Sequence, residues 1–472
     1  MSKNSNYLEI KHIFRAYDIR GIFNEEITPY THFRIGLAFG TYLQNVKGME
    51  ISSKYIFIAY DIRQTSSLLA QAFAAGVMTT GINIEFSGES LQFGACMFSA
   101  WQGKAYATAY ITASHLPPEW NGIKFYYGTG VGFSEEDNIR IRDIFLEGKF
   151  MRAKWNKVGQ MTVKNYKEEY IQFLKTKFSI SRKLKVVVDC GNGTSCLSAP
   201  DVLKAIGLEV VPLFCNVDPT FPNRPSEPNE KTLRFLAEKV KVENADFGVG
   251  FDGDGDRAVI VDDKGRILIA DTTGLILAKF MLREETKSRR VIINVECSLA
   301  LEKVLTPLAT VERIKVGHTF LTAEAQKKPD TLIGIESSGH MVFPSVFLFD
   351  DAMLIPLKLA EVLSDLETPL SEIVDELPKL HKRKIAVAAS DTIKFEVISQ
   401  LLETMRNRYE KVTSIDGIGI SFGTESWVLI RASNTGPKIR IIVEAETDMQ
   451  ANDLLSEFQR QLEAKINELT NN

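Results

Sequence analysis

Cysteine is scarce in this chain, and its cysteines have no spacing typical of a zinc site. There are five, an odd number: Cys96, Cys190, Cys196, Cys215 and Cys297. A disulfide framework needs pairs of cysteines, and structural disulfides belong to oxidising compartments. We therefore expect reduced, mostly structural thiols, which favours a cytoplasmic location.

The sequence also lacks the segments that direct a chain to membranes or to nucleic acid. No apolar run approaches the ~20 residues that a membrane-spanning helix needs. The opening MSKNSNYLEIKHIF has no basic start followed by an apolar stretch, so we expect no signal peptide there. Charges of both signs are mixed, with a net charge of −4 and no long basic run. These absences predict no membrane and no nucleic-acid partner, and they leave the oligomeric state open.

What the chain does contain is an alternation of apolar strands and amphipathic helices. Strand-like runs occur at 55–61, 185–193 and 290–298, and each leads to a helix-like stretch such as 65–81. This alternation predicts α/β units on buried, mixed or parallel sheets. The spacing predicts three similar α/β domains, at residues 1–155, 156–258 and 259–376.

The pattern changes in the last quarter of the chain. Strand-like runs occur at 382–390, 426–433 and 438–446. Residues 391–408 have a helical pattern, and residues 449–469 carry one apolar stripe at helical spacing. Residues 377–472 are therefore predicted to form a smaller α+β domain, after a linker near 366–378.

The stretch GFDGDGDR (250–257) places three carboxylates within five residues, on Asp252, Asp254 and Asp256. Carboxylates this close repel one another unless a cation lies between them. The glycines favour a tight loop, and a hard divalent ion such as Mg²⁺ prefers oxygen ligands. An EF-hand is excluded because Arg257 and Asp263 would stand at its sixth and twelfth positions. The loop predicts a metal site, with a phosphatase-type nucleophilic aspartate or a solvated acidic turn as alternatives.

A serine loop lies upstream, in ITASHLPPEWNGIK (111–124). Ser114 stands in a polar, proline-bounded segment where it would serve as an exposed nucleophile, and Lys124 would serve as a base or phosphate partner. Taken alone, the segment also fits an ordinary turn with Ser114 as a helix cap.

Two later stretches carry groups suited to sugars and phosphates. IGIESSGH (333–340) offers a carboxylate, a hydroxyl and an imidazole, which suit sugar hydroxyls, on Glu336, Ser338 and His340. RASNTGPK (431–438) offers a guanidinium, polar side chains and backbone N–H groups, which suit a phosphate, on Arg431, Ser433, Asn434 and Thr435. Each stretch alone also fits a polar turn or hairpin.

Together and in this order, the four stretches resemble the signature loops of the α-D-phosphohexomutase superfamily, which includes phosphomannomutase/phosphoglucomutase. FRAYDIRG (14–21) and FPNRPSEPNE (221–230) resemble two further motifs of that family, so the resemblance covers essentially the whole chain. It implies four domains around a central cleft, three of them α/β. It also implies interconversion of hexose 1- and 6-phosphates of mannose and/or glucose, through a phosphoserine enzyme and a 1,6-bisphosphate that also serves as activator.

The resemblance further implies a role for each matching residue. Ser114 would be phosphorylated beside one Mg²⁺ ion, in a metal site that it forms with Asp252, Asp254 and Asp256. Lys124 and His115 would assist proton transfer, while Arg20 and Arg257 would support the phosphoserine. The sugar would be bound by Tyr17, His318, Glu336, Ser338 and His340. The substrate's own phosphate would be held by Arg431, Ser433, Asn434 and Thr435.

Some residues depart from the family pattern. Leu116 replaces the asparagine usual after Ser-His, and Glu296 stands where related sequences often have lysine, so a substrate contact is expected to be lost or reversed in sign. Ala432 and Gly436 depart from the form seen in some subfamilies. These changes concern the sugar more than the reaction class. Phosphoglucosamine mutase, a Mg²⁺-dependent sugar-phosphate phosphatase and a non-catalytic sugar-phosphate-binding relative are the alternatives.

Overall fold

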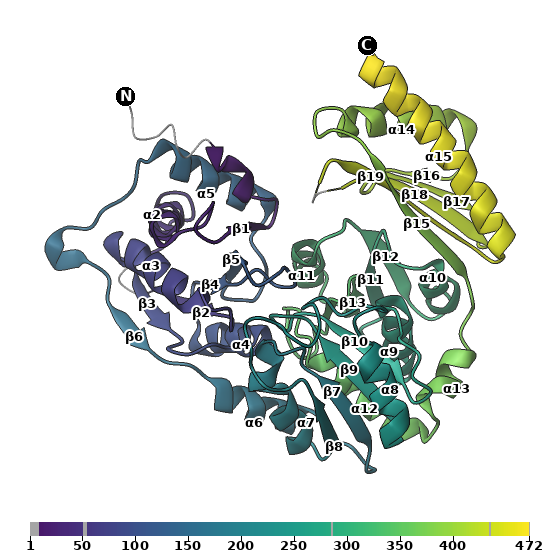
Figure 1. The fold of residues 1–472 in the computed structure, drawn as a ribbon, viewed down its shortest axis with the longest axis horizontal. Coiled ribbons are helices and arrows are strands. Elements are labelled where there is room, and N and C mark those ends of the chain that lie inside the picture. Colours follow the sequence, from purple (N-terminus) through teal and green to yellow (C-terminus); the bar gives the residue numbers. More distant parts are fainter. Residues whose placement is uncertain (1–8, 51–53, 285–286, 434–435, 472) are drawn as a thin grey trace.

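The computed structural model describes residues 9–50, 54–284, 287–433 and 436–471. These residues form four sheets with their own helices, and the C-terminal sheet lies beside the third (Figure 1). The predicted class, three α/β domains followed by an α+β domain, is confirmed. No helix in this part of the chain is long and apolar enough to cross a membrane.

The first sheet has the strand order β1-β5-β4-β2-β3-β6 and carries the serine loop between β4 and β5. Its strands are β1 (Asp18–Ile22), β2 (Tyr55–Tyr60), β3 (Asn83–Phe86), β4 (Ala107–Ile111), β5 (Trp120–Tyr127) and β6 (Met161–Val163). Its helices are η1 (Lys11–Ile13), α2 (Pro29–Asn45), α3 (Ser66–Thr79), α4 (Phe93–Gly103), α5 (Glu135–Glu147) and η2 (Trp155–Lys157). β2, β3, β4 and β6 run parallel, whereas β5 is antiparallel to β4 and to β1.

The second sheet, in the order β10-β9-β7-β8, carries the aspartate loop at the tight connection between β9 and β10. Its strands are β7 (Lys185–Asp189), β8 (Glu209–Leu213), β9 (Phe247–Phe251) and β10 (Ala258–Asp262). Its helices are α6 (Lys167–Lys177), η3 (Thr194–Leu197), α7 (Ala199–Ala205) and α8 (Arg234–Glu243). Gly255 in the connection has φ +76°, a backbone conformation that favours glycine.

The third sheet has the order β12-β11-β13-β14, with the first three strands parallel. Its strands are β11 (Arg290–Asn294), β12 (Thr310–Ile314), β13 (Thr331–Ile335) and β14 (Met341–Val342). Its helices are α9 (Ala270–Glu284), α10 (Leu299–Leu305), α11 (His318–Lys327), α12 (Leu354–Leu366) and α13 (Leu370–Asp375). Glu336 and His340 therefore lie in the short connection between β13 and β14.

The fourth sheet is antiparallel throughout, in the order β15-β19-β18-β17-β16. Its strands are β15 (His381–Ala388), β16 (Val412–Thr413), β17 (Ile418–Phe422), β18 (Ser426–Ala432) and β19 (Lys438–Ala445). Helices α14 (Lys394–Arg408) and α15 (Asp448–Asn471) pack on it, as the apolar stripe of the last helix predicts. Within that stripe Phe458 and Leu462 are fully buried.

Two sheets extend past the domain divisions expected from the sequence. β6 lies beyond residue 155 and pairs with β3 of the first sheet. β10 begins at residue 258 and pairs with β9 of the second sheet. We therefore propose that the first domain ends near residue 165 and the second near residue 265, in each case after the edge strand.

The segment expected as a linker near 366–378 is folded rather than extended. It contains α13, where Leu370 is buried and Ser371 donates to both carboxylate oxygens of Asp263. Arg266 pairs with Asp375 at 2.6 Å. The connection to the C-terminal domain is thus anchored on the hairpin that follows the aspartate loop.

The apolar cores divide the molecule unequally. One cluster runs through the first three domains and includes Phe98, Val186 and Phe347. The C-terminal domain has its own core, and a small apolar cluster that includes Val295 and Trp427 joins it to the third domain. The first three domains therefore form a common body, against which the fourth is docked.

Candidate functional site

Ser114 lies in the loop between β4 and β5, and its side chain is fully buried. Its φ of +53° is in the left-handed region, which residues other than glycine rarely adopt. The Thr112 hydroxyl accepts a hydrogen bond from the Ser114 N–H at 2.8 Å and donates to Asp254 Oδ2 at 3.1 Å. The serine loop is therefore tied directly to the aspartate loop of the second domain.

The carbonyl groups of the serine loop converge on Arg63, which is buried just before α3. Its two terminal nitrogens donate at 2.6–3.2 Å to the carbonyl oxygens of Ser114, Leu116, Pro117 and Trp120. Its Nε donates to Asp61 Oδ2 at 3.1 Å. The position of Leu116 is thus held through its backbone carbonyl.

The aspartate loop is organised around Asp252. One of its carboxylate oxygens, Oδ1, accepts the N–H groups of Gly255, Asp256 and Arg257 at 3.0–3.2 Å. The other oxygen, Oδ2, accepts the Ser114 hydroxyl at 3.3 Å. The loop backbone therefore orients the carboxylate of Asp252 toward the serine.

The three aspartates offer a coordination site for a hard cation. Oxygens of Asp252, Asp254 and Asp256 all lie within 4.8 Å of one another, and all three side chains are buried. Asp254 Oδ1 and Asp256 Oδ1 have no hydrogen-bond partner among the described residues, which is costly for buried carboxylates without a cation. A second such group, Asp256 with His340 and Asp350, is less suited to Mg²⁺, because it includes a nitrogen ligand.

The charges around these aspartates make their carboxyl groups unequal. Burial, with Asp256 and Asp254 close by, raises the pKa of Asp252 well above its usual value. For Asp256 burial acts in the same direction, but Lys124 and nearby cations outweigh it and lower the pKa. A divalent cation would remove this conflict, because it favours the ionised form of all three groups.

Lys124 and His115 lie between the cavity and the group formed by the serine and the aspartates. Lys124 Nζ lies 2.9 Å from Asp254 Oδ2 and 2.5 Å from Asp256 Oδ2. Burial opposes its charge, yet these two carboxylates raise the pKa of Lys124 above its usual value. His115 Nδ1 lies 3.4 Å from Ser114 Oγ, and burial together with Arg257 and Arg20 lowers the pKa of His115 to about 2. Lys124 is therefore charged and His115 neutral.

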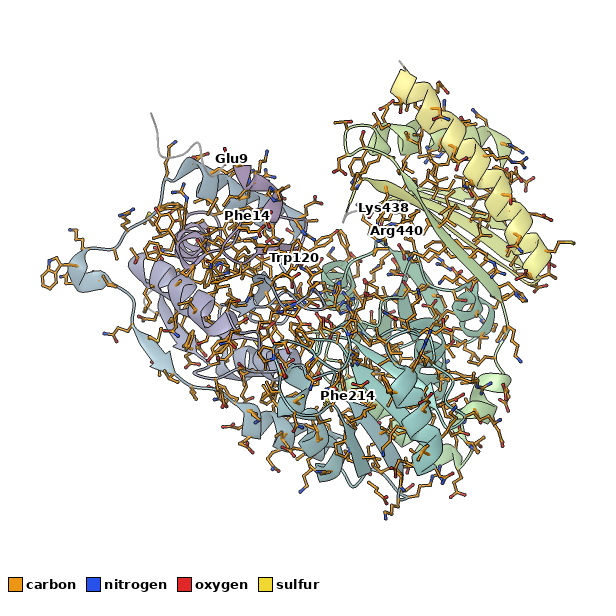
Figure 2. All side chains as sticks on the ribbon, viewed as in Figure 1. Glu9, Phe14, Trp120, Phe214, Lys438 and Arg440 are labelled. Atoms are coloured by element: carbon orange, nitrogen blue, oxygen red, sulfur yellow. The ribbon has the colours of Figure 1, made fainter. Side chains whose placement is uncertain are left out.

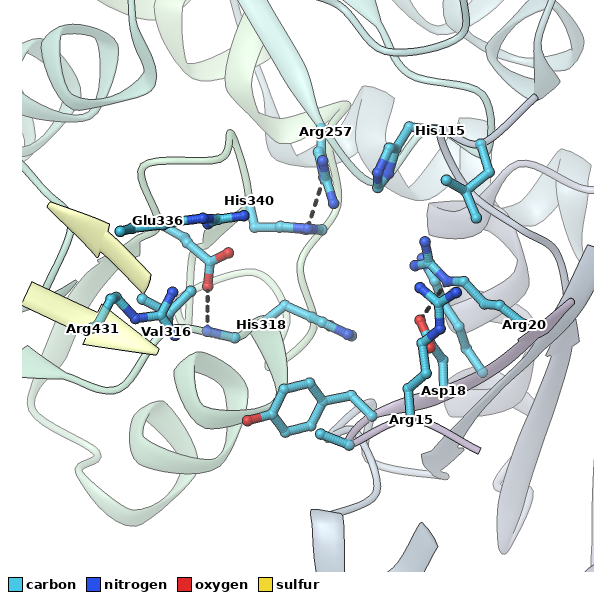
Figure 3. Close-up of a pocket in the computed structure, with 16 residues that line it drawn as sticks. Arg15, Asp18, Arg20, His115, Arg257, Val316, His318, Glu336, His340 and Arg431 are labelled. Carbon is cyan, nitrogen blue, oxygen red and sulfur yellow. Dashed lines mark hydrogen bonds and ion pairs between the residues drawn. The ribbon is translucent and has the colours of Figure 1, made fainter. Parts of the chain in front are cut away.

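A cavity of about 400 Å³ opens in front of this group (Figure 3). Its walls come from all four domains, with Arg20 and His115 from the first, Arg257 from the second, Glu336 from the third and Arg431 from the fourth. Ser114 and the three aspartates are not part of the wall and lie behind Lys124 and His115. One end of the cavity is therefore closed by Lys124 and His115, with the serine and the aspartates behind them, and five arginines also line its walls: Arg15, Arg20, Arg257, Arg431 and Arg440.

Most of the sequence-predicted site residues line this cavity. They are Tyr17, Arg20, His115, Lys124, Arg257, His318, Glu336, His340 and Arg431. Ser338 is exposed and does not line the cavity; its hydroxyl donates to Glu336 Oε1 at 2.6 Å. Ser433 is buried outside the wall, and Asn434 and Thr435 lie outside the described residues.

The second carboxylate oxygen of Glu336 contacts the cavity wall at Gly317. Glu336 Oε2 accepts the Gly317 N–H at 2.9 Å, and Gly317, with φ +140°, precedes α11. This contact fixes the start of the helix that carries His318. The carboxylate thus has one oxygen toward Ser338 and the other toward the cavity-lining backbone.

A buried carboxylate that the motifs do not include organises the two histidines. Asp350 Oδ2 lies 2.6 Å from His340 Nδ1 and 3.6 Å from His318 Nδ1, and the two imidazole rings stack with centroids 5.2 Å apart. Arg257 Nε donates to His340 Nε2 at 3.0 Å. His340 therefore accepts from the second domain at one ring nitrogen and faces Asp350 at the other.

Arg431 stands at the end of β18, where the third and fourth domains meet. Its Nη1 donates to Glu296 Oε1 and its Nη2 to Asp416 Oδ2, both at 2.9 Å. Arg440, on the neighbouring strand β19, also lines the cavity and lies 3.5 Å from Glu296 Oε1. Figure 2 shows Arg440 on the side of the C-terminal sheet that faces the other domains. Arg431 is thus held between two carboxylates.

Several residues of the site were not predicted from the sequence. Arg15 and Asp18 lie within the quoted FRAYDIRG motif, and Arg440 stands nine residues after Arg431. The motif position and the strand pairing of Arg440 with Arg431 could have indicated them. Asp350 has no such signal, because its contacts depend entirely on the packing of the third domain.

Models of four consecutive domain families match the chain. They are phosphoglucomutase/phosphomannomutase α/β/α domain I at residues 11–152, domain II at 168–265, domain III at 270–381 and the C-terminal domain at 373–461. The four families thus match the greater part of the chain, in chain order.

Individual proteins resemble the chain over almost its whole length. A phosphoglucomutase/phosphomannomutase from Thermococcus kodakarensis is 34% identical over 451 residues, covering 94% of this chain and 96% of its own. A probable phosphoglucosamine mutase from Pyrococcus horikoshii is 30% identical, covering 97% and 99%. The crystal structure of a phosphoglucomutase/phosphomannomutase family protein from Burkholderia thailandensis superimposes with a TM-score of 0.87 at 26% identity, covering 96% and 98%.

Proposed function

The chain belongs to the phosphoglucomutase/phosphomannomutase family, and we propose that it interconverts the 1- and 6-phosphates of glucose and mannose. Proteins of this family are phosphohexomutases, which are intramolecular phosphotransferases. The observation that carries the proposal is the arrangement of one cavity with Ser114 and three aspartates behind one wall and a buried arginine in another. A phosphatase would need the first feature but not the second.

In the proposed cycle Ser114 carries the phosphoryl group that is transferred. The free hydroxyl oxygen of a hexose phosphate attacks the phosphorus, and the bond from phosphorus to Ser114 Oγ breaks. His115, beside Ser114 Oγ, and Lys124, beside Asp254 and Asp256, are proposed to assist the proton transfers at the attacking and leaving oxygens. The bisphosphate then turns over, and its other phosphate returns to Ser114.

The metal site of the proposal consists of Asp252, Asp254 and Asp256, with the phosphate on Ser114 as a further ligand. Their clustered oxygens and the two unpartnered ones fit one Mg²⁺ ion. When bound, the ion would neutralise charge on the phosphoryl group during transfer. Arg20 and Arg257 line the cavity, and we propose that they support the same group.

The rest of the cavity would bind the substrate. Tyr17, His318, Glu336 and His340 are proposed to bind the sugar, with Ser338 acting through Glu336. Arg431 is proposed to hold the phosphate that is not being transferred, together with the turn that contains Ser433, Asn434 and Thr435. A trace of hexose 1,6-bisphosphate would act as activator by phosphorylating Ser114. The five free cysteines fit a cytoplasmic location.

Phosphoglucosamine mutase is the second candidate, because relatives of that name are also about 30% identical over nearly the whole chain. The test is turnover of glucose, mannose and glucosamine 1-phosphates, each primed with a trace of the matching 1,6-bisphosphate. We expect conversion to the 6-phosphate, fastest for glucose or mannose, with little release of inorganic phosphate. Stoichiometric release of inorganic phosphate would instead identify a phosphatase, and fastest turnover of glucosamine 1-phosphate would identify the second candidate.

A further inference from the structure

Glu296 lies at the end of the third sheet and contacts three cations of the fourth domain. Its Oε1 accepts from Arg431 Nη1 at 2.9 Å and lies 3.5 Å from Arg440 Nη1, while its Oε2 accepts from Lys384 Nζ at 2.7 Å. These cations come from β18, β19 and β15, so the carboxylate meets the sheet at three strands. A single anionic group thus faces a cluster of cations next to the cavity.

The carboxylate is held in the ionised form. Burial alone would raise the pKa of Glu296, but Lys384, Arg431 and Arg440 lower it below its usual value. Its backbone is fixed as well, because its N–H donates to Asn294 Oδ1 and its carbonyl accepts from Lys382. Glu296 is therefore a permanent and well-positioned negative charge.

Arg431 retains a donor that these carboxylates do not use. Its Nη1 and Nη2 are taken by Glu296 and Asp416, but its buried Nε has no hydrogen-bond partner in the described part of the chain. An unpartnered buried N–H costs free energy, so the site retains a donor for one more acceptor. Arg431 and Arg440 both line the cavity, so that acceptor would come from the ligand.

We propose that Glu296 is an internal counter-ion, which pairs with Arg431 and Arg440 in place of the substrate phosphate and so weakens the binding of that phosphate. This inference rests on the proposed function, in which Arg431 holds the phosphate that is not transferred. A phosphate oxygen at Nε alone would leave Nη1 with Glu296, whereas a phosphate that takes both donors competes with the carboxylate for Nη1. A lysine at this position would add a cation to the cluster, whereas Glu296 removes one unit of positive charge.

Such a counter-ion suits a reaction in which the bisphosphate must turn over midway. A site that held either phosphate very tightly would stabilise the intermediate and delay its reorientation. With Glu296 present, the released guanidinium regains its second charged partner at once, while Asp416 remains its other one. The affinity of the site for the phosphate is thereby kept moderate.

The test measures ligand affinity without turnover. Variants are made in a Ser114→Ala background, and calorimetric titration gives the Kd of glucose 1-phosphate. Glu296→Gln keeps the size and an acceptor oxygen but removes the charge, so Kd is expected to fall roughly three- to tenfold. In an Arg431→Ala background the same substitution is expected to change Kd by less than about twofold, because only the longer contact of Glu296 with Arg440, at 3.5 Å, then remains to be released.

Glu446→Gln is the matched control. Glu446 pairs with Lys303 across the same domain interface but is exposed and has no contact with Arg431. Its Kd should equal that of the Ser114→Ala parent, which shows that a weakened domain contact by itself does not tighten binding. An equal gain in affinity from Glu446→Gln would overturn the proposal.

An unchanged or higher Kd in Glu296→Gln would also overturn it, because Glu296 would then only position Arg431. If Glu296→Gln does not fold, Glu296→Asp decides, since its shorter side chain withdraws the charge from Arg431. A Kd below the parent value is expected there, and an unchanged or higher one contradicts the proposal. Mutase activity of the unaltered chain is assayed separately, so failure of the proposed function is distinguishable from failure of this inference.

Discussion

The two ends of the cavity, which are both proposed to bind a phosphate, are built in different ways. At the serine end Ser114 is fully buried, its loop is held by Arg63 and Thr112, and the core behind it is continuous through three domains. At the arginine end Arg431 is held by Glu296 across a domain interface with a small apolar cluster, and by Asp416 of its own domain. The position of Ser114 is thus fixed by hydrogen bonds and by a continuous core. Arg431 is instead held by ion pairs, in which a phosphate can replace a carboxylate.

This difference matches what each end must do in the proposed cycle. Phosphoryl transfer demands that the reacting oxygens stay aligned within a narrow range. Binding of the second phosphate demands charge and donors, but also release when the bisphosphate turns over. Substitutions at the serine end are therefore expected to affect the chemical step, and those at the arginine end to affect binding.

The largest effect is expected for Ser114→Ala, which removes the hydroxyl proposed to carry the phosphoryl group. Turnover should fall by about a thousandfold or more, since no other residue can take this role. Intact-mass measurement of active protein should show a fraction heavier by one phosphate, which maps to residues 111–124 and disappears in the variant. Ser456→Ala, on an exposed part of α15, is the control and should change neither quantity. Full activity in Ser114→Ala would refute the role of this serine.

The three aspartates should act as one unit at the same end. Asp252→Asn, Asp254→Asn and Asp256→Asn are each expected to lower kcat by similar factors of about a hundred or more, and double variants should lose little further. Chelation should reproduce the loss, and added Mg²⁺ should restore the activity of the unaltered protein. Asp218→Asn, in a turn of the same domain, is the control. Activity that survives thorough chelation would contradict a metal site.

A smaller and different effect is expected at the arginine end. Arg431→Ala should lower kcat/KM about ten- to a hundredfold for glucose and mannose phosphates alike, because it removes charge-assisted hydrogen bonds to a group that both share. Phosphorylation of Ser114 and the requirement for Mg²⁺ should persist. Arg408→Ala, whose partner Glu457 lies on the outside of the same domain, should have no effect. A changed preference between the sugars would show that Arg431 contacts the sugar instead.

The smallest effect concerns the stability of the common body formed by the first three domains, which lies behind the serine end. Burial raises the pKa of Asp351 to about 7, in the common core where it accepts the Tyr170 hydroxyl at 2.8 Å. Because the pKa is raised on folding, the stabilisation is complete below about pH 4 and is lost as the pH rises through about 7.

Asp351→Asn mimics the neutral acid, so its Tm should match that of the unaltered protein near pH 4.5 and exceed it by a few degrees near pH 8. Thermal unfolding across this pH range measures the difference between the two curves. For Asp375→Asn, at a surface ion pair of α13, the difference in Tm from the unaltered protein should not grow in this way with pH. Parallel curves for Asp351→Asn and the unaltered protein would show that Asp351 is ionised in the fold.

Much of the fold could be predicted because its signals are local. The strand-like runs at 55–61, 185–193 and 290–298 correspond to β2, β7 and β11, and the helical stripe at 449–469 corresponds to α15. Apolar periodicity reports which face of an element is buried, whatever covers it. The division between domains was less predictable, since edge strands such as β6 are short and exposed and carry no such pattern.

By itself the sequence determined the chemical groups of this protein and the loops that carry them. Ser114, the three aspartates, Glu336 and Arg431 stand in short motifs whose residue types and spacing already indicate metal, sugar and phosphate chemistry. Only the tertiary structure decided which groups meet. Arg63 holds the serine loop from 51 positions away, and Glu296 pairs with Arg431 across 135 positions. Ser338, although within a motif, lies exposed and reaches the site only through Glu336. The physical reason is that residue type and periodicity act over a few neighbouring residues, whereas buried charge pairs depend on how separately folded sheets dock.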